Sequence, residues 1–366
     1  MSKLAIIGDM HFGVKNGHPE FLNFQLYWFE ECLKKLQEMG ITVIYQTGDL
    51  FDTRSHMRLN VMHAMITQFP ELLEKYGIKK FIIIGGNHDM FYRDINNICS
   101  LQLIELLNDR KGFTTEFLIY TDDVGVMEFG GKTLNFVPWL NKNNSTRLLN
   151  EVSQNKADYL FGHFEMVGMP MIPGVLCEHG VDVDQFKDHK RVISGHFHTV
   201  SESKNCTMVG TPYHITWNDV QDGDNRGFWI LDVATNDLVL HKNEEHMTLF
   251  SVIKYDPTFA YDDEYFVPYE GTIAKVLVSE NPDPKHYKKF RALLNNVKFI
   301  DYNTIDTTMV IADKVEISEE VLSLDTLSAI KTYIDMQGDG FEKDSVKTLA
   351  EEIFMEVSTD VKQINS

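Results

Sequence analysis

Residues 79–89 read KKFIIIGGNHD, an apolar run that ends abruptly in a polar, glycine-containing turn. The run 81–84 is typical of a strand buried on both faces, although a segment this short does not exclude a helix by periodicity alone. The same pattern occurs in KLAIIGDMH (3–11), TVIYQTGDLFD (42–52), ADYLFGHFE (157–165) and RVISGHFHT (191–199). We therefore expect a sheet-based domain that extends from residue 3 to about 235.

Longer segments lie between the early strands, at 19–40 and 58–77, and carry apolar residues at helical spacing with a closing glycine. Later segments, at 132–140, 206–217 and 227–243, favour antiparallel strands and hairpins. Strands and helices alternate at first and then give way to strands. The sequence thus predicts a layered α/β domain with mixed sheets, not a purely doubly wound one.

An acidic, aromatic and turn-rich stretch near residues 243–270 marks the predicted domain boundary. We expect the first domain to span 1–242. Beyond it, a strand, a helix and a second strand predict a small α/β cap domain over 243–317. Residues 318–366 contain two helical patterns and are expected to form a C-terminal helical segment.

Composition indicates a soluble globular protein, with 43% hydrophobic and 24% charged residues in 366. The N-terminal segment has only four consecutive apolar residues before Gly8, so we expect neither a signal peptide nor a membrane span. The cysteines are far apart and indicate neither a disulfide framework nor a thiolate zinc site: Cys32, Cys99, Cys177 and Cys206. A cytoplasmic protein with free thiols, in the host cytoplasm if viral, is the simplest expectation.

The formal net charge of -20 argues against a chain that wraps nucleic acid by charge alone. Two circumstances would weaken this objection. Bound divalent ions would supply positive charge at acidic ligands, and a partner subunit could make most of the phosphate contacts.

Each strand-to-turn junction ends in oxygen or nitrogen ligands that suit a hard or borderline metal. These residues are Asp9, His11, Asp49, Asn87, His163, His196 and His198. Loops at the carboxyl ends of strands converge in α/β sheets, so the junctions can share one site. Seven ligands exceed the need of one tetrahedral ion and suit two ions bridged by a carboxylate. The mixture of Asp, His and Asn favours Mn²⁺ or a similar first-row ion over a thiolate-loving one, although ligand type alone does not separate Mn²⁺ from iron or zinc.

The ordered motifs D-x-H, GD, GNHD, GH and GHxH resemble those of the calcineurin-like metallophosphoesterase superfamily. This resemblance implies a four-layer α/β/β/α sandwich. Within the superfamily, GDMHFG, GDLFD and GGNHD, followed by a small domain and a helical tail, are similar to the SbcD-type DNA repair nucleases. The likeness extends to bacteriophage recombination nucleases that work with an SbcC-type ATPase.

The resemblance assigns roles to the matching positions. It implies a first metal held by Asp9, His11 and His198, a bridging Asp49, and a second metal completed by Asn87, His163 and His196. By the same resemblance, His88 would protonate or stabilise the departing sugar oxygen, Asp89 could orient its imidazole, and His56 would lie near the nucleic-acid path. From the residues alone, His88 could equally brace its turn and His56 could be a solvated loop residue.

Three features outside the predicted metal site each allow two interpretations. The basic residues Lys285, Lys288, Lys289 and Arg291 could contact DNA phosphates or form a solvated helix face. The C-terminal helices could fold back or, as the resemblance implies, bind the ATPase partner. The helical stretches expected around residues 58–76 and 95–107 could form a homodimer contact or an ordinary core.

The resemblance implies a two-metal DNA nuclease that acts as a 3′-to-5′ exonuclease on double-stranded ends and as an endonuclease on single strands. Its expected setting is double-strand-break repair, recombination and replication, with an SbcC-type ATPase. The alternatives are a phosphatase or small-molecule phosphodiesterase on the same metals, and a non-catalytic scaffold. GDLFDTR and GNHD differ from the GDxVDRG and GNHE of protein phosphatases, which disfavours the first alternative.

Overall fold

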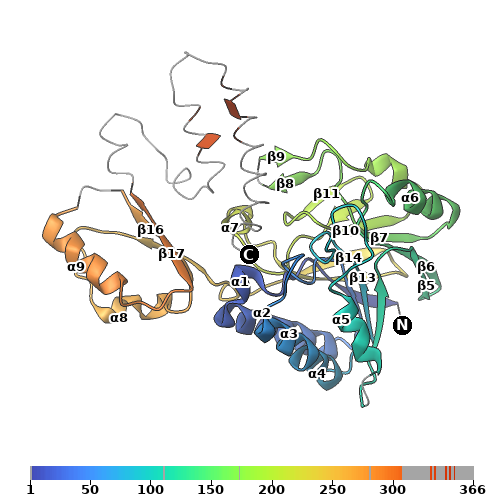
Figure 1. Ribbon diagram of the computed structural model, residues 1–366, viewed down its shortest axis with the longest axis horizontal. Coiled ribbons are helices and arrows are strands. Elements are labelled where there is room, and N and C mark those ends of the chain that lie inside the picture. The colour runs from blue at the N-terminus through green and yellow to red at the C-terminus, as the bar shows by residue number, and fades with distance from the viewer. Residues whose placement is uncertain are drawn as a thin grey trace. The chain divides into compact units, whose positions relative to one another are not determined.

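The computed structural model describes residues 2–109, 112–172, 174–279 and 282–306, with seven further positions between 330 and 350. The chain divides into two compact units, Met1–Thr248 and Leu249–Ser366 (Figure 1). The predicted C-terminal segment 318–366 lies almost wholly outside the described residues. Within those residues, no helix combines the length and the apolar character that crossing a bilayer requires.

The first unit contains two six-stranded sheets (Figure 1). The first sheet consists of β1 (Lys3–Ile7), β2 (Val43–Gln46), β3 (Lys80–Ile84), β4 (Glu116–Tyr120), β13 (Gly227–Asp232) and β14 (Asp237–Lys242). Its strand order is β14-β13-β1-β2-β3-β4. β1 to β4 are parallel, whereas β13 pairs antiparallel with β1 and with β14.

The second sheet consists of β5 (Gly125–Phe129), β6 (Lys132–Val137), β7 (Tyr159–His163), β10 (Arg191–Gly195), β11 (Ser201–Ser203) and β12 (Cys206–Met208). The order is β11-β12-β10-β7-β6-β5, with a parallel centre and antiparallel edges. A separate short hairpin pairs β8 (Pro170–Ile172) with β9 (Val175–Leu176).

Short and long helices connect these strands. They are α1 (Val14–Gly17), α2 (Pro19–Glu38), α3 (Leu59–Ile66), α4 (Gln68–Lys75), α5 (Gln102–Glu105), η1 (Leu106–Asp109), α6 (Ser145–Gln154), η2 (Val183–Phe186) and α7 (Trp217–Asp222).

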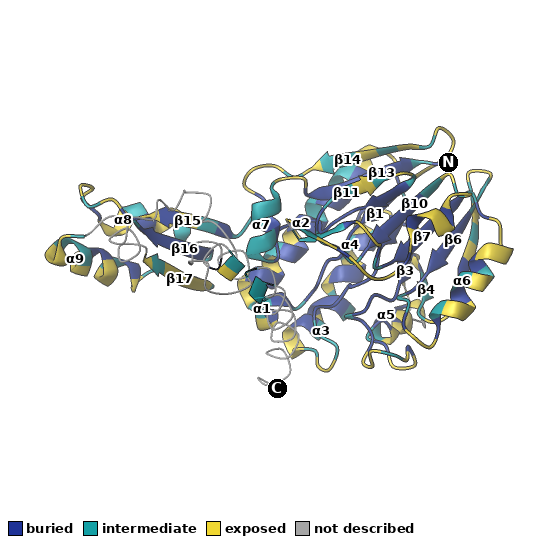
Figure 2. Ribbon diagram, turned by 90° about the horizontal axis from the view of Figure 1, so that it is seen from above, coloured by how far each residue is buried: buried dark blue, intermediate teal, exposed yellow. Residues whose placement is uncertain are grey.

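The two sheets pack face to face through one apolar core. Leu4 and Ile6 point into it from β1, and Tyr159 and Phe161 point into it from β7. Successive side chains of a strand face opposite sides of its sheet, so the residues between them face outward. Figure 2 shows the strands of both sheets as largely buried.

Helices cover the outward faces of both sheets. Phe69 of α4 packs edge-on against Phe81 of β3, with 5.3 Å between ring centroids, and Phe29 of α2 stacks on Phe69. On the second sheet, Leu148 and Val152 of α6 join its outer apolar cluster. The resulting order of helix, sheet, sheet and helix confirms the predicted four-layer α/β sandwich.

Three local expectations differ from the structure. The pattern at 58–77 forms two helices, because Pro70 lacks an N–H and its ring would clash with the carbonyl of residue 66 in one continuous helix. The stretch 95–107 becomes helical only from Gln102. Of the segments expected to be antiparallel, 227–243 forms the antiparallel β13–β14 hairpin. The other two give β6, which pairs parallel with β7, and β12, which pairs parallel with β10.

The second unit contains a three-stranded sheet, whose order is β15-β16-β17, and the short helices that accompany it. Its elements are β15 (Phe250–Lys254), α8 (Asp263–Phe266), η3 (Val267–Tyr269), β16 (Ile273–Val278), α9 (Pro284–Leu294) and β17 (Asp301–Asp306). All three strands are parallel. Phe290 and Leu294 of α9 pack into an apolar core with Val276 of β16.

Candidate metal centre

The structure brings all seven predicted ligand residues together in the first unit. β1, β2 and β3 of one sheet lead into the turns that carry Asp9, His11, Asp49 and Asn87. β7 ends at His163, and β10 leads directly into His196 and His198. The centre is therefore built from the carboxyl ends of strands that belong to two different sheets.

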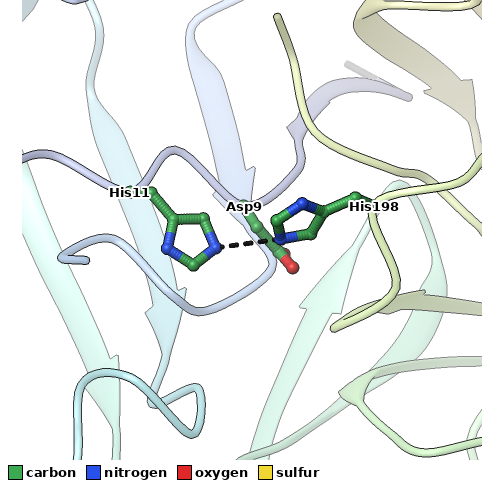
Figure 3. A group of neighbouring side chains, drawn as sticks. All are labelled: Asp9, His11 and His198. Atoms are coloured by element: carbon green, nitrogen blue, oxygen red, sulfur yellow. Dashed lines mark hydrogen bonds between the residues drawn. The ribbon is translucent and has the colours of Figure 1, made fainter. Parts of the chain in front are cut away.

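One group of ligand atoms comes from Asp9, His11 and His198, and these atoms lie within 4.8 Å of one another. The Nε2 atoms of His11 and His198 are 3.2 Å apart, and the Asp9 carboxylate lies beside them (Figure 3). Asp9 and His11 are buried. Two imidazole nitrogens that face each other beside a buried carboxylate suit a shared cation.

A second group contains Asp49, His163 and His196, again with ligand atoms within 4.8 Å of one another. Asn87 completes it, because its Oδ1 lies 2.9 Å from His163 Nε2 and 2.8 Å from His196 Nδ1. The mixture of imidazole, amide and carboxylate ligands suits a first-row divalent ion.

Asp49 faces both groups. Its Oδ2 is 3.4 Å from His163 Nε2 and 3.8 Å from His11 Nε2. Its Oδ1 accepts a hydrogen bond of 2.7 Å from the backbone N–H of His88. This placement fits the bridging role that the resemblance implies for Asp49.

Neighbouring glycines make room for these side chains. A Cβ on Gly86 would lie 2.2 Å from Asp49 Oδ1, and a Cβ on Gly195 would lie 2.3 Å from Asp9 Oδ1. Three of the ligand residues themselves have a positive φ, namely His11, Asp49 and His196. Such backbone conformations are costly and persist at sites where the surrounding structure enforces them.

The protonation of the buried ligands follows from their mutual charges. Burial raises the pKa of Asp9, and the charge of Asp49 adds to that rise. Burial would also raise the pKa of Asp49, but the charges of His163 and His88 hold it well below its usual range. Burial would lower the pKa of His163, yet the carboxylates of Asp49 and Asp9 raise it to about 9.

The charges of these residues are compatible with bound divalent ions. The imidazoles balance the buried carboxylates by holding protons, and a divalent ion would supply that positive charge in place of the protons. His163 has the orientation that this exchange requires. Its Nδ1–H donates to the backbone carbonyl of Thr47 at 2.8 Å, so Nε2, which faces Asn87, is the atom that can bind an ion. The donor set therefore fits divalent ions.

His88 lies at the edge of the centre and is partly exposed. Its Nδ1–H donates to the backbone carbonyl of Asp52 at 2.6 Å, and its ring meets that of His11 edge-on at 4.8 Å. The predicted role of His88 at the leaving group stays a prediction, but its place beside the first group is compatible with it.

Asp89 has a different set of contacts from the one expected. Its buried carboxylate accepts hydrogen bonds from the backbone N–H groups of Gly86, Leu50 and Phe51, at 3.0 to 3.3 Å. Burial and the charge of Asp49 raise the pKa of Asp89 to about 7. Asp89 thus ties the turn after β3 to the turn after β2, and the carbonyl of Asp52 occupies the place beside the imidazole of His88.

The other predicted residues lie outside both ligand groups. His56 is exposed and lines a small recess of about 20 Å³ together with Phe12, Phe51 and Arg58. Lys285, Lys288, Lys289 and Arg291 are exposed on α9 of the second unit.

Sequence reasoning missed several residues that contact the ligands. Asp52 Oδ1 is 3.4 Å from His11 Nδ1, and Glu165 Oε1 is 3.5 Å from His196 Nε2. Asp52 closes the motif GDLFD and could have been singled out by its position there. The carbonyl of Thr47 gave no sequence signal, because any residue carries a backbone carbonyl.

Arg54 was also missed. Burial lowers the pKa of the Arg54 guanidinium below its usual value, although the nearby carboxylates of Asp49 and Asp89 act in the opposite direction. Its Nη1 is buried without a hydrogen-bond partner among the described residues. A cation so close to the centre favours an anionic substrate there.

The fold and the centre define a metal-dependent phosphoesterase, and comparison with known proteins agrees. Residues 2–200 match the calcineurin-like phosphoesterases, so the chain belongs to this family. The predicted family and the enzyme class that goes with it are thereby confirmed.

A relative in Enterobacteria phage T4 is exonuclease subunit 1, which is 30% identical to this chain over 234 residues. The match covers 64% of this chain and 65% of the relative, so the chain spans somewhat less than two thirds of that protein's length. Among solved structures, a protein of unknown function from Aquifex aeolicus, AQ665, is 16% identical. It covers 51% of this chain and 93% of its own, with a TM-score of 0.25.

The two ligand groups predict that the neighbouring histidines His196 and His198 serve different ions. We expect His196→Ala and His198→Ala each to leave about one of two Mn²⁺ ions bound, because His196 faces Asn87 whereas His198 faces His11. Mn²⁺ titration followed by electron paramagnetic resonance measures the stoichiometry. His189→Ala, just before β10 in sequence and outside both groups, is the control; loss of both ions in either ligand variant would contradict the assignment.

Proposed function

We propose that this chain is a two-metal DNA nuclease, acting as a 3′-to-5′ exonuclease on double-stranded ends and as an endonuclease on single strands. The observation that carries the proposal is the pair of neighbouring ligand groups, of which the second contains Asp49 and the first lies next to it. The likeness to a phage exonuclease subunit supports DNA as the substrate. We further propose Mn²⁺ as the metal, with Mg²⁺ and Fe²⁺ as alternatives.

Two divalent ions in such a centre lower the pKa of a water and neutralise the charge that develops at phosphorus. The residues of the chain itself do the rest. Asp49 would supply a carboxylate oxygen next to both ligand groups. It also accepts a hydrogen bond from the backbone N–H of His88, which fixes the turn that carries that histidine. Arg54 adds a positive charge near Asp49, which favours binding of a phosphate.

His88 is proposed to donate the proton that the departing sugar oxygen requires. The carbonyl of Asp52 accepts from its Nδ1–H whether the ring is neutral or protonated, so this contact orients the ring without removing its proton. Nε2 is then the atom that can give a proton away. A histidine held in this manner suits general acid catalysis.

The basic face of α9 is proposed to contact DNA backbone phosphates. All four of its cationic residues, Lys285, Lys288, Lys289 and Arg291, are exposed, in a chain whose formal net charge is -20. Contacts of this kind position DNA without reading its sequence.

Two protein partners are proposed as well. An SbcC-type ATPase would place the nuclease in double-strand-break repair, recombination and replication, in the cytoplasm of a phage-infected cell. A second copy of the chain would form a homodimer through the face of α3 and η1, where Leu59 is 76% and Leu106 is 68% exposed. Light scattering of the full chain, alone and mixed with a candidate ATPase, checks both; monomeric masses in both samples would contradict them.

The proposed activity predicts that Asp49→Asn abolishes Mn²⁺-dependent cleavage of DNA, because an amide cannot supply the bridging negative charge. The assay uses end-labelled duplex and single-stranded DNA with Mn²⁺ or Mg²⁺, with and without a candidate ATPase, and reads polarity from the products. Asp123→Asn, at a carboxylate that is 83% exposed, is the matched control.

Two results of this assay would count against the proposal. Unchanged cleavage by Asp49→Asn would overturn the catalytic assignment. Hydrolysis of a generic aryl phosphate by the wild type, without any cleavage of DNA, would favour the phosphatase alternative.

The proposed role of His88 predicts that His88→Asn slows DNA cleavage by about 10² to 10⁴, the usual contribution of a general acid. Hydrolysis of bis(p-nitrophenyl) phosphate should fall much less, because nitrophenolate leaves without a proton. Rates on the two substrates are compared at saturating Mn²⁺, with His246→Asn, at an imidazole that is 64% exposed, as the control. Equal losses on both substrates would show a structural role instead.

The proposed phosphate contacts of α9 predict a weaker salt dependence of DNA binding when Lys285, Lys288, Lys289 and Arg291 are all replaced by Gln. Each lost contact should reduce the slope of log K against log salt by about 0.9. Fluorescence anisotropy across a salt series measures the slope. The control makes the same change in net charge at four ion-paired lysines of the first unit, Lys34, Lys75, Lys142 and Lys204; equal slopes in the two variants would contradict the contact.

A further inference from the structure

His198 is held by a carboxylate that none of the motifs contains. Asp219 is the third residue of α7 and is 2% exposed. Its Oδ1 lies 3.2 Å from Nδ1 of His198. The two residues are 21 positions apart in sequence, so their contact depends on how the turn before α7 folds back on the loop after β10.

Backbone hydrogen bonds fix the position of the Asp219 carboxylate. Its Oδ2 accepts from the N–H of Ile215 at 2.8 Å and from the N–H of Thr216 at 2.6 Å. The Thr216 hydroxyl in turn accepts from the N–H of Asp219, which completes a capping box at the start of α7. Oδ2 of Asp219 therefore accepts from two backbone N–H groups, whereas Oδ1 faces His198.

A buried arginine, Arg226, contacts both the backbone of His198 and the helix that carries Asp219. Arg226 donates from Nη1 to the backbone carbonyl of His198 and, at 2.7 Å, to Thr211 Oγ1. Its Nη2 donates to the carbonyl of Asp219 at 3.3 Å and to Asp222 Oδ2 at 2.7 Å. The backbone of His198 and the helix that carries Asp219 are therefore tied to one cation.

The contact decides which nitrogen of His198 carries the proton. A carboxylate only accepts hydrogen bonds, so Nδ1 of His198 must be the protonated atom. Nε2 then presents its lone pair toward Nε2 of His11, 3.2 Å away, in the group that also contains Asp9 (Figure 3). Only this tautomer offers the first ion a ligand.

We propose that Asp219 is a positioning residue for the first metal ion, which it serves by fixing the ring orientation and the Nδ1–H tautomer of His198. The inference rests on the proposed role of His198 as a ligand in the nuclease centre. Residues that orient a metal-binding histidine typically contribute about 10- to 100-fold to metal affinity. Asp219 itself does not touch the reacting groups.

Asparagine at position 219 should break this arrangement while keeping the shape of the side chain. The two backbone donors at Ile215 and Thr216 require an oxygen, so the amide oxygen must face them. The NH₂ group then faces His198 and donates to Nδ1, which moves the ring proton to Nε2. The nitrogen that should bind the ion would carry a hydrogen instead.

The test is a Mn²⁺ titration of the full metal-free chain, followed by electron paramagnetic resonance, for the wild type and Asp219→Asn. We expect the variant to bind one of the two ions about 10- to 100-fold more weakly, in the pattern of His198→Ala and not of His196→Ala. Asp224→Asn is the matched control, because this carboxylate lies just after the same helix, is 95% exposed and is 3.9 Å from His214, outside the arrangement around His198. Wild-type affinities in Asp219→Asn, or an equal loss in Asp224→Asn, would overturn the inference.

A second measurement uses the wild type alone, in case Asp219→Asn does not fold. Metal-free protein labelled with ¹⁵N-histidine, with the His198 signals assigned by His198→Gln, reports the tautomer directly. Protonated Nδ1 is expected, and protonated Nε2 alone would overturn the inference. Failure of the wild type to bind any Mn²⁺ would instead overturn the two-metal centre, so the two failures are distinguishable.

Discussion

Two buried carboxylates, Asp9 and Asp49, impose the constraint on which the centre depends. Their negative charges lie close enough that the charge of Asp49 contributes to the raised pKa of Asp9. Burying two such charges is costly unless positive charge is placed beside them. Their ion-pair partners are imidazoles, His163 for both and His11 for Asp49, and imidazoles can exchange protons for metal ions. The same residues therefore balance the buried charge in the folded unit and can exchange that positive charge for metal ions.

The tight packing around these carboxylates explains why the chain places glycine next to its ligands. Asp9 and Asp49 each lie where a Cβ on Gly195 or on Gly86 would collide with a carboxylate oxygen. His196 follows Gly195 directly and adopts a φ of 92°. The sharp turns after β1, β2, β3 and β10 are thus a consequence of bringing their side chains to one point, and the surrounding packing enforces their backbone conformations.

The candidate ligand residues could be singled out from the sequence because each stands in a local pattern, a buried strand followed by a glycine turn. Asp219 was not, since its contact with His198 joins segments that no local pattern connects. The orienting partner of His88 was unpredictable for another reason: it is the backbone carbonyl of Asp52, which has no side-chain signature. In the fold, the strand ends were clear, whereas the pairing partners of β6 and β12 depend on tertiary packing and could not be read from alternation alone.

Each ligand group takes residues from both sheets. Asp9 and His11 follow β1 in the first sheet and meet His198, which follows β10 in the second. Asp49 follows β2 in the first sheet and meets His163, at the end of β7, and His196 in the second. An ion in either group would link the two sheets at the edge of their shared core, and its binding free energy would add to the stability of their packing. Loss of apolar contacts between the sheets would conversely separate the two halves of both groups, so the ligands and the core cannot be changed independently.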